Sequence, residues 1–138
     1  MLGLFKNPQT AHELEGIWER VGDEFEGSLV KVYRAQDELI GQLIVSTPAM
    51  LDAGWEIGDK KWRQIEGDPH EGWHLLDLRK QYDTQNKKLI STDYAHYWIS
   101  IGGFQNSRTL RLHQSKVPLF AEQNWKKVGE LIVANESL

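Results

Sequence analysis

Short runs in which apolar and polar residues alternate dominate the chain, and turn-forming residues separate them. The runs lie at 16–21, 28–34, 39–46, 62–66, 73–82, 88–101 and 108–113. A period of two with many β-branched and aromatic side chains is typical of strands. Because no long helical pattern stands between the runs, we predict a mainly β protein with antiparallel strands. Seven or eight such strands would have no unpaired edges if they closed into an up-and-down barrel.

Two other segments predict short helices. Residues 10–13 have the Thr-x-x-Glu form of a capping box, which predicts a short helix near the N-terminus. Thr47 suits an N-cap, Pro48 the first helical position and Gly54 the exit, which together predict a helical turn after the third run.

The C-terminal segment carries two periodicities at once. Apolar residues at 117, 121, 125, 128 and 132 recur at helical spacing, which favours a helix over 118–131. Alternation over 123–128 would instead make the segment a last strand. We prefer the helix, and the strand remains the alternative.

Composition excludes several classes of protein. The 138 residues suit one domain spanning 1–138, since a chain of this size buries roughly two thirds of its surface on folding. The absence of cysteine excludes disulfides, thiolate nucleophiles and cysteine-rich zinc sites. A net charge of −4 with well-mixed signs disfavours a nucleic-acid partner. We interpret the densest basic run, 60–63, as a solvated strand end.

No stretch approaches the roughly 20 apolar residues that a spanning helix needs, so we predict no membrane span. The apolar start at 1–6 is too short for a signal peptide. We therefore expect a cytoplasmic location.

Two motifs resemble signatures of the lipocalins and their calycin relatives. Residues 16–18 match the Gly-x-Trp motif of the first strand, and 92–97 match a Thr-Asp-Tyr-x-x-Tyr motif near the next-to-last strand. The spacing is also similar to a small bacterial family of lipocalin-like domains that ends in a Gln-x-Trp-x-basic run, as 123–127 does approximately. The second comparison would make the C-terminal segment a strand.

The resemblance implies a barrel with an internal cavity for small apolar ligands. It also implies that Trp18 and Arg108 pack together to close one end and do not touch the ligand.

Aromatic residues are the most abundant candidates for a cavity wall, because Trp and Tyr combine an apolar face with one hydrogen-bonding group. Tyr94, His96 and Trp98 share one strand face, and Trp55 and Trp62 flank the predicted helical turn near a barrel mouth. The candidate ligand-binding residues are Tyr33, Trp55, Trp62, Arg79, Tyr94, His96, Tyr97 and Trp98.

One polar residue would anchor the ligand, and Arg79, His96 and Tyr97 are the candidates. Arg79 shares a strand face with Asp77 and could receive a carboxylate or phosphate. The opposite face of that strand, which carries Leu76 and Leu78, is more apolar and is the preferred inner face.

Apparent His–carboxylate pairs do not predict catalysis. His74 and Asp77 are three residues apart, as are Asp93 and His96, and odd separations on a strand put side chains on opposite faces. Asp68, His70 and His74 straddle a turn and need not converge on a metal. We predict no catalytic residues, no metal and no cofactor.

The leading interpretation is a non-enzymatic barrel that buries a small hydrophobic or amphipathic ligand. The first alternative is an isomerase, lyase or hydrolase that uses a cavity histidine and a carboxylate from another strand. The second alternative is a packed-core interaction module that forms a homodimer through an exposed aromatic patch.

Overall fold

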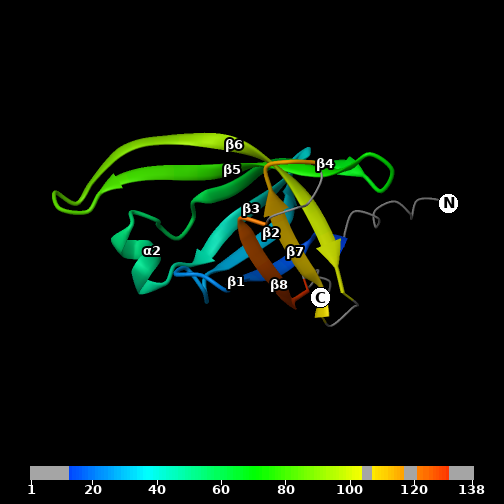
Figure 1. Ribbon diagram of the computed structural model, residues 1–138, viewed down its shortest axis with the longest axis horizontal. Coiled ribbons are helices and arrows are strands. Elements are labelled where there is room, and N and C mark those ends of the chain that lie inside the picture. The colour runs from blue at the N-terminus through cyan, green and yellow to red at the C-terminus, as the bar shows by residue number, and fades with distance from the viewer. Residues whose placement is uncertain (1–12, 104–106, 117–120, 131–138) are drawn as a thin grey trace.

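A computed structural model describes residues 13–103, 107–116 and 121–130. Eight strands form a closed antiparallel barrel in which each strand pairs with its neighbours in chain order and the first pairs with the last (Figure 1). The strands are β1 Gly16–Val21, β2 Leu29–Ala35, β3 Glu38–Val45, β4 Lys60–Asp68, β5 Gly72–Asp83, β6 Lys88–Gly102, β7 Thr109–His113 and β8 Gln123–Gly129. The prediction of a mainly β, up-and-down barrel is confirmed.

Over the described residues 121–130, the C-terminal segment forms the strand β8 and not the helix preferred over 118–131. β8 pairs with both β1 and β7, and its Gln123 and Trp125 are buried. The helical prediction was wrong here because closure of the barrel needs the backbone hydrogen bonds of one more strand. The N-terminal helix predicted at 10–13 lies outside the described residues except for Glu13.

The predicted helical turn is confirmed as α2, Pro48–Asp52, between β3 and β4. Oγ1 of Thr47 accepts a hydrogen bond from the backbone N–H of Met50 at 3.3 Å, as an N-cap should. α2 lies beside the β5–β6 hairpin, which extends past the rest of the barrel (Figure 1). Gly54 has φ +89°, and a Cβ there would lie 2.5 Å from Cδ1 of Tyr82 on β5. Only glycine allows this close approach.

Three tryptophans fill the middle of the barrel: Trp18, Trp62 and Trp125 are each at most 1% exposed. The rings of Trp62 and Trp125 meet edge to face, with centroids 4.9 Å apart. Trp62 also lies directly against Gly41 of β3, where a Cβ would be 2.6 Å from its Cε3. All three belong to the hydrophobic core of the barrel.

The two most buried residues of β5, Leu75 and Asp77, lie on the face that the sequence predicted to be the outer one, although Leu78 of the expected inner face is also buried. Asp77 is 2% exposed and His74 lies on the opposite, outer face beside His96. The expectation failed because Asp77 has a buried cationic partner on β4, Lys61, which offsets the cost of burying a carboxylate.

The cation over Trp18 is Lys127 of β8 and not Arg108. Nζ of Lys127 lies 5.8 Å from the ring centroid of Trp18, whereas Arg108 forms an ion pair with Glu13. The indole N–H of Trp18 donates to the carbonyl of Leu14 at 2.9 Å.

Within the described ranges, no helix has the length and apolar character needed to span a membrane.

Candidate functional site

A pocket of about 340 Å³ opens at the end of the barrel next to α2, and we call it the α2-end pocket. Its walls come from β1 and the loop after it, from the end of α2, and from β4, β5, β6 and β8. The lining residues are Arg20, Phe25, Ala53, Trp55, Lys61, Asp77, Leu78, Arg79, Lys80, Tyr82, Thr84, Tyr97 and Gln123. The volume falls in the lower part of the range of small-molecule sites.

The carboxylate of Asp77 in the pocket wall accepts three side-chain hydrogen bonds. Its Oδ1 accepts from Nζ of Lys61 at 2.6 Å and from Nε1 of Trp62 at 2.9 Å. Its Oδ2 accepts from Nε2 of Gln123 at 3.0 Å. The ammonium of Lys61 and the carboxylate of Asp77 are thus buried together. The three hydrogen bonds fix the orientation of this carboxylate.

Gln123 connects this pair to a second cation. Its Oε1 accepts from Nη1 of Arg20 at 3.3 Å and from Nε1 of Trp125 at 3.2 Å. Arg20 in turn forms an ion pair with Asp23, at 2.7 Å between Nη2 and Oδ2. Its guanidinium lies 5.5 Å from the ring centroid of Phe25 and 5.3 Å from that of Trp125. Contacts on all sides leave Arg20 with little freedom to reorient toward a ligand.

Lys61 is 2% exposed, and burial lowers the pKa of its ammonium against the opposing effect of Asp77. Desolvation disfavours the charged form of an amine. Nζ of Lys61 lies 4.8 Å from the ring centroid of Trp55, another wall residue. The sequence predicted that residues 60–63 form a solvated strand end. Lys61 is buried instead, because Trp55 and the strands of the barrel cover it.

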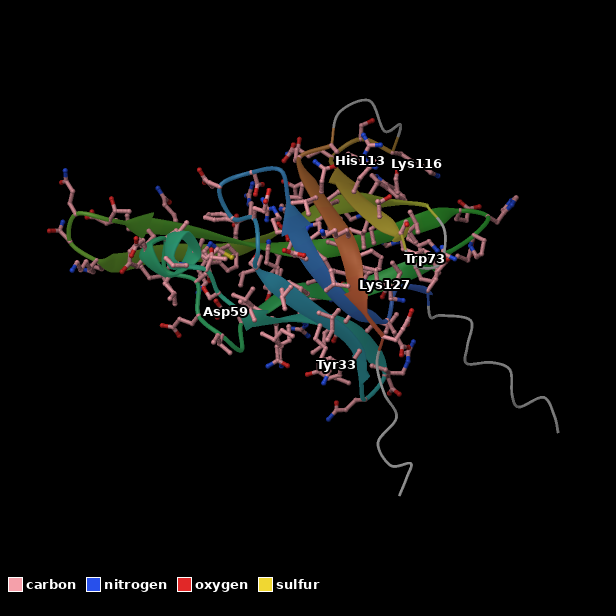
Figure 2. All side chains as sticks on the ribbon, turned by 90° about the horizontal axis from the view of Figure 1, so that it is seen from below. Tyr33, Asp59, Trp73, His113, Lys116 and Lys127 are labelled. Carbon is pink, nitrogen blue, oxygen red and sulfur yellow. The ribbon has the colours of Figure 1, made fainter. Side chains whose placement is uncertain are left out.

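The outer wall of the pocket is aromatic and cationic. Lys80 donates to the carbonyl of Gly54 at 2.8 Å, pairs with Asp59 at 2.7 Å and lies 5.3 Å from the Trp55 ring centroid. Figure 2 shows Asp59, the partner of Lys80, on the α2 side of the molecule. Lys80 is therefore held in place by the segment that follows α2.

Arg79 differs from the other cations of the pocket because it is accessible. Its Nε and Nη2 donate to Asp93 of β6 at 3.2 and 2.8 Å, and the two side chains are 53% and 61% exposed. Exposed ion pairs contribute at most about 1 kcal/mol. A ligand anion could therefore replace Asp93 at little cost.

Tyr97 lies at the inner edge of the pocket on β6. Its hydroxyl donates to Oε1 of Glu122 at 2.6 Å. Burial, followed by this contact with a carboxylate, raises the pKa of Tyr97 to about 12. The phenol therefore stays protonated and acts as a hydrogen-bond donor at neutral pH.

The structure brings three of the sequence-predicted residues together in the pocket: Trp55, Arg79 and Tyr97. Trp62 lies in the packed interior and does not line the pocket, but its indole N–H donates to the wall residue Asp77. Tyr33 lies elsewhere, with its hydroxyl donating to Gln42 at 2.8 Å.

The stripe of Tyr94, His96 and Trp98 lies on the outer face of β6. His96 lies 5.1 Å from His74 and 5.2 Å from Trp98 between ring centroids. Nζ of Lys116, which lies away from α2 in Figure 2, is 5.1 Å from the Trp98 ring centroid. The prediction that His74 and Asp77 face opposite ways is confirmed, and no described histidine lines the pocket.

Sequence reasoning missed Lys61, Arg20 and Gln123. Regular alternation at 60–63 would bury only one of Lys61 and Trp62, whereas the structure buries both. The sequence carried no signal for Lys61, because the burial of its partner Asp77 was itself not predicted; a carboxylate known to lie inside the barrel would have required a donor nearby.

Sequence reasoning also missed the contact of Ser100 with His113 at 2.7 Å. Nδ1 of His113 lies 3.0 Å from the carbonyl of Ser115. Neither Ser100 nor His113 lines the α2-end pocket, so this pair is not part of the site.

A larger hollow of about 580 Å³ lies along the ends of β2, β3 and β4. Charged and amide side chains such as Arg34, Asp37, Glu38 and Gln64 line most of it, so it offers little apolar surface to bury. Within the described stretches, no three His, Asp or Glu side chains converge as a metal site would require.

Comparisons of the chain with models of known protein families, with curated proteins and with solved structures find no match.

Proposed function

We propose that the protein binds a small amphipathic molecule in the α2-end pocket. One observation carries this proposal: the pocket combines four aromatic side chains, Phe25, Trp55, Tyr82 and Tyr97, with an accessible arginine. Apolar walls with a few polar groups are typical of small-molecule sites. The aromatic walls would bury the apolar part of the ligand at about 25 cal/mol per Å².

Arg79 would anchor an anionic group of the ligand. Its guanidinium presents a planar fork that fits a carboxylate or a phosphate. Arg20, Lys61 and Lys80 are themselves at most 8% exposed and are held by their ion-pair partners, whereas Arg79 and its partner are both exposed. We therefore expect an aromatic or short aliphatic acid and not a long neutral lipid.

The proposal includes a relationship to lipocalin-like barrels. The closed antiparallel topology and the buried Trp18 at the start of the first strand support it. Lys127 of the last strand supplies the cation that the resemblance assigned to Arg108.

The experiment is a binding titration of the full chain by calorimetry with a panel of aromatic carboxylates and fatty acids. Arg79→Gln should weaken binding of the acids by about tenfold or more, because a hydrogen bond to a charged group contributes about 1.5–3 kcal/mol. Arg111→Gln, which alters an exposed arginine of β7, is the matched control and should leave the affinity unchanged.

Ala53→Trp should block binding by filling the pocket at the end of α2. Far-UV circular dichroism would establish that this variant is folded. The proposal fails if no member of the panel binds, or if the folded Ala53→Trp variant binds as tightly as the original protein.

A further inference from the structure

A buried ion pair in the pocket wall is not explained by ligand anchoring. Lys61 and Asp77 are each 2% exposed, and their charged atoms are 2.6 Å apart. Buried pairs of this kind contribute little net stability, because removing both charges from water costs about as much as their attraction returns. A position beside a pocket gives such a lysine a chemical use that a packed core would not.

We infer that Lys61 captures a small aldehyde or ketone from the α2-end pocket as a Schiff base. Lys61 and Asp77 both line the pocket, and Trp55 covers the amine on one side with its ring. A buried amine beside apolar walls is the environment in which lysines form imines with carbonyl compounds. This inference rests on the proposed function, because the carbonyl compound must first enter the same pocket.

The neighbouring groups suit the proton transfers. Burial lowers the pKa of the Lys61 ammonium, which increases the fraction of neutral, nucleophilic amine near pH 7. Oδ1 of Asp77 accepts a hydrogen bond from Nζ and so lies where it can take a proton from the nitrogen. Oδ1 and Oδ2 are also held by Trp62 and Gln123, which keeps the carboxylate in position during the reaction.

The step balances without an oxidant or a reductant. The nitrogen lone pair of Lys61 bonds to the carbonyl carbon, and the carbonyl π pair moves to the oxygen, which is protonated. The nitrogen gives up its protons by way of Asp77, the hydroxyl leaves as water, and a C=N bond forms. The net change is amine plus carbonyl to imine plus one water, and hydrolysis reverses it.

The pocket also defines the kind of carbonyl compound. The aromatic walls favour a ring, and Arg79 favours an acid group on the same molecule. 4-Formylbenzoate combines a ring, a carboxylate and an aldehyde, and 4-methylbenzoate is its counterpart without the carbonyl group.

The test is reductive trapping on the full-length protein. The protein is incubated at pH 7 with 4-formylbenzoate and sodium cyanoborohydride, and peptide mass spectrometry locates the adduct among the ten lysines. We expect the adduct on Lys61 to exceed that on the exposed Lys60 by about tenfold or more, because the aromatic walls and Arg79 would hold the aldehyde beside Lys61. An excess of 4-methylbenzoate should protect Lys61.

Variants provide the matched controls. Lys61→Arg keeps the positive charge next to Asp77 and should abolish the specific adduct, whereas Lys60→Arg should leave it unchanged. The site of the adduct on the original protein decides the question even if Lys61→Arg does not fold.

The inference is overturned if adducts spread over exposed lysines without enrichment at Lys61 while the aromatic acids still bind in the pocket. If none of the acids binds and Lys61 is not labelled, the proposed function fails as well. The two failures are therefore distinguishable.

Discussion

The middle of the barrel and its α2 end use the same strands in opposite ways. In the middle, Trp18, Trp62 and Trp125 are buried in the hydrophobic core, each at most 1% exposed. At the α2 end, the same sheet holds Asp77 and Lys61 as a buried ion pair beside a pocket of about 340 Å³. We therefore expect the tryptophan layer to supply most of the stability, whereas the polar end retains groups that packing alone does not require.

The largest expected loss in the free energy of unfolding tests the role of the tryptophan layer in the middle of the barrel. Trp18→Ala should lower the free energy of unfolding by about 3–5 kcal/mol, because it removes a large buried side chain and leaves a cavity. Urea denaturation followed by circular dichroism would measure it. Trp98→Ala on the outer face of β6 should cost less than half as much, and equal losses would show that the interior is not the main source of stability.

The next effect tests the buried pair. Asp77→Asn should lower the free energy of unfolding by about 3 kcal/mol, because it leaves the Lys61 ammonium buried without its partner charge. Asp93→Asn, which breaks an exposed pair, should cost less than about 1 kcal/mol. Thermal denaturation of both variants provides the comparison.

The double variant Lys61→Met with Asp77→Leu makes the same test sharper. If the pair adds little net stability, the double variant should recover most of the loss caused by Asp77→Asn. A double variant as unstable as Asp77→Asn would show that the pair supports the fold, which would weaken the case for a chemical role.

A smaller effect on the free energy of unfolding is expected at the more exposed ion pair between Glu38 and Arg63. Hydrogen bonding from Arg63 lowers the pKa of the half-buried Glu38. The carboxylate therefore stabilises the fold above the ordinary glutamate pKa of about 4.3, and the contribution is lost as pH falls through the lower folded value. Glu38→Gln should cost about 0.5–1 kcal/mol at pH 7, and the difference from the original protein should vanish in acid. A pH-independent difference would contradict this explanation.

The smallest effect concerns the outer face of β5 and β6. Burial, and then repulsion from His74, lowers the pKa of His96. Because the unfolded chain binds more protons between the folded pKa and about 6.5, stability falls as pH drops through that window. NMR titration of the imidazole should show His74→Asn raising the pKa of His96, and an unchanged value would exclude the repulsion.

Strands with one buried and one exposed face could be predicted from the sequence, as could the α2 turn with Thr47 and Pro48 at its start. For β8 the strand was only the alternative to a preferred helix, because its apolar residues satisfy helical and strand spacing at once, and only the need to pair with β1 and β7 selects the strand. Local patterns cannot express that requirement.

The candidate site was predicted in part. Trp55 was expected at a barrel mouth, and Arg79 was expected to share a face with Asp77, and both line the pocket. Lys61 was missed because its partner lies on the next strand and Trp55 covers it from a separate segment. The alternation of apolar and polar residues in a single strand does not predict contacts of this kind between distant residues.

The pairing of β1 with β8 also has a kinetic consequence. Arg20 and Gln123, which meet across this ladder, are 103 residues apart in the chain. Contacts at such separation slow folding, because the loop entropy is lost before the contact forms, and barrels rich in them fold in milliseconds to seconds. We expect a refolding intermediate in which the β2–β6 meander is already protected from hydrogen exchange while the first and last strands still exchange freely.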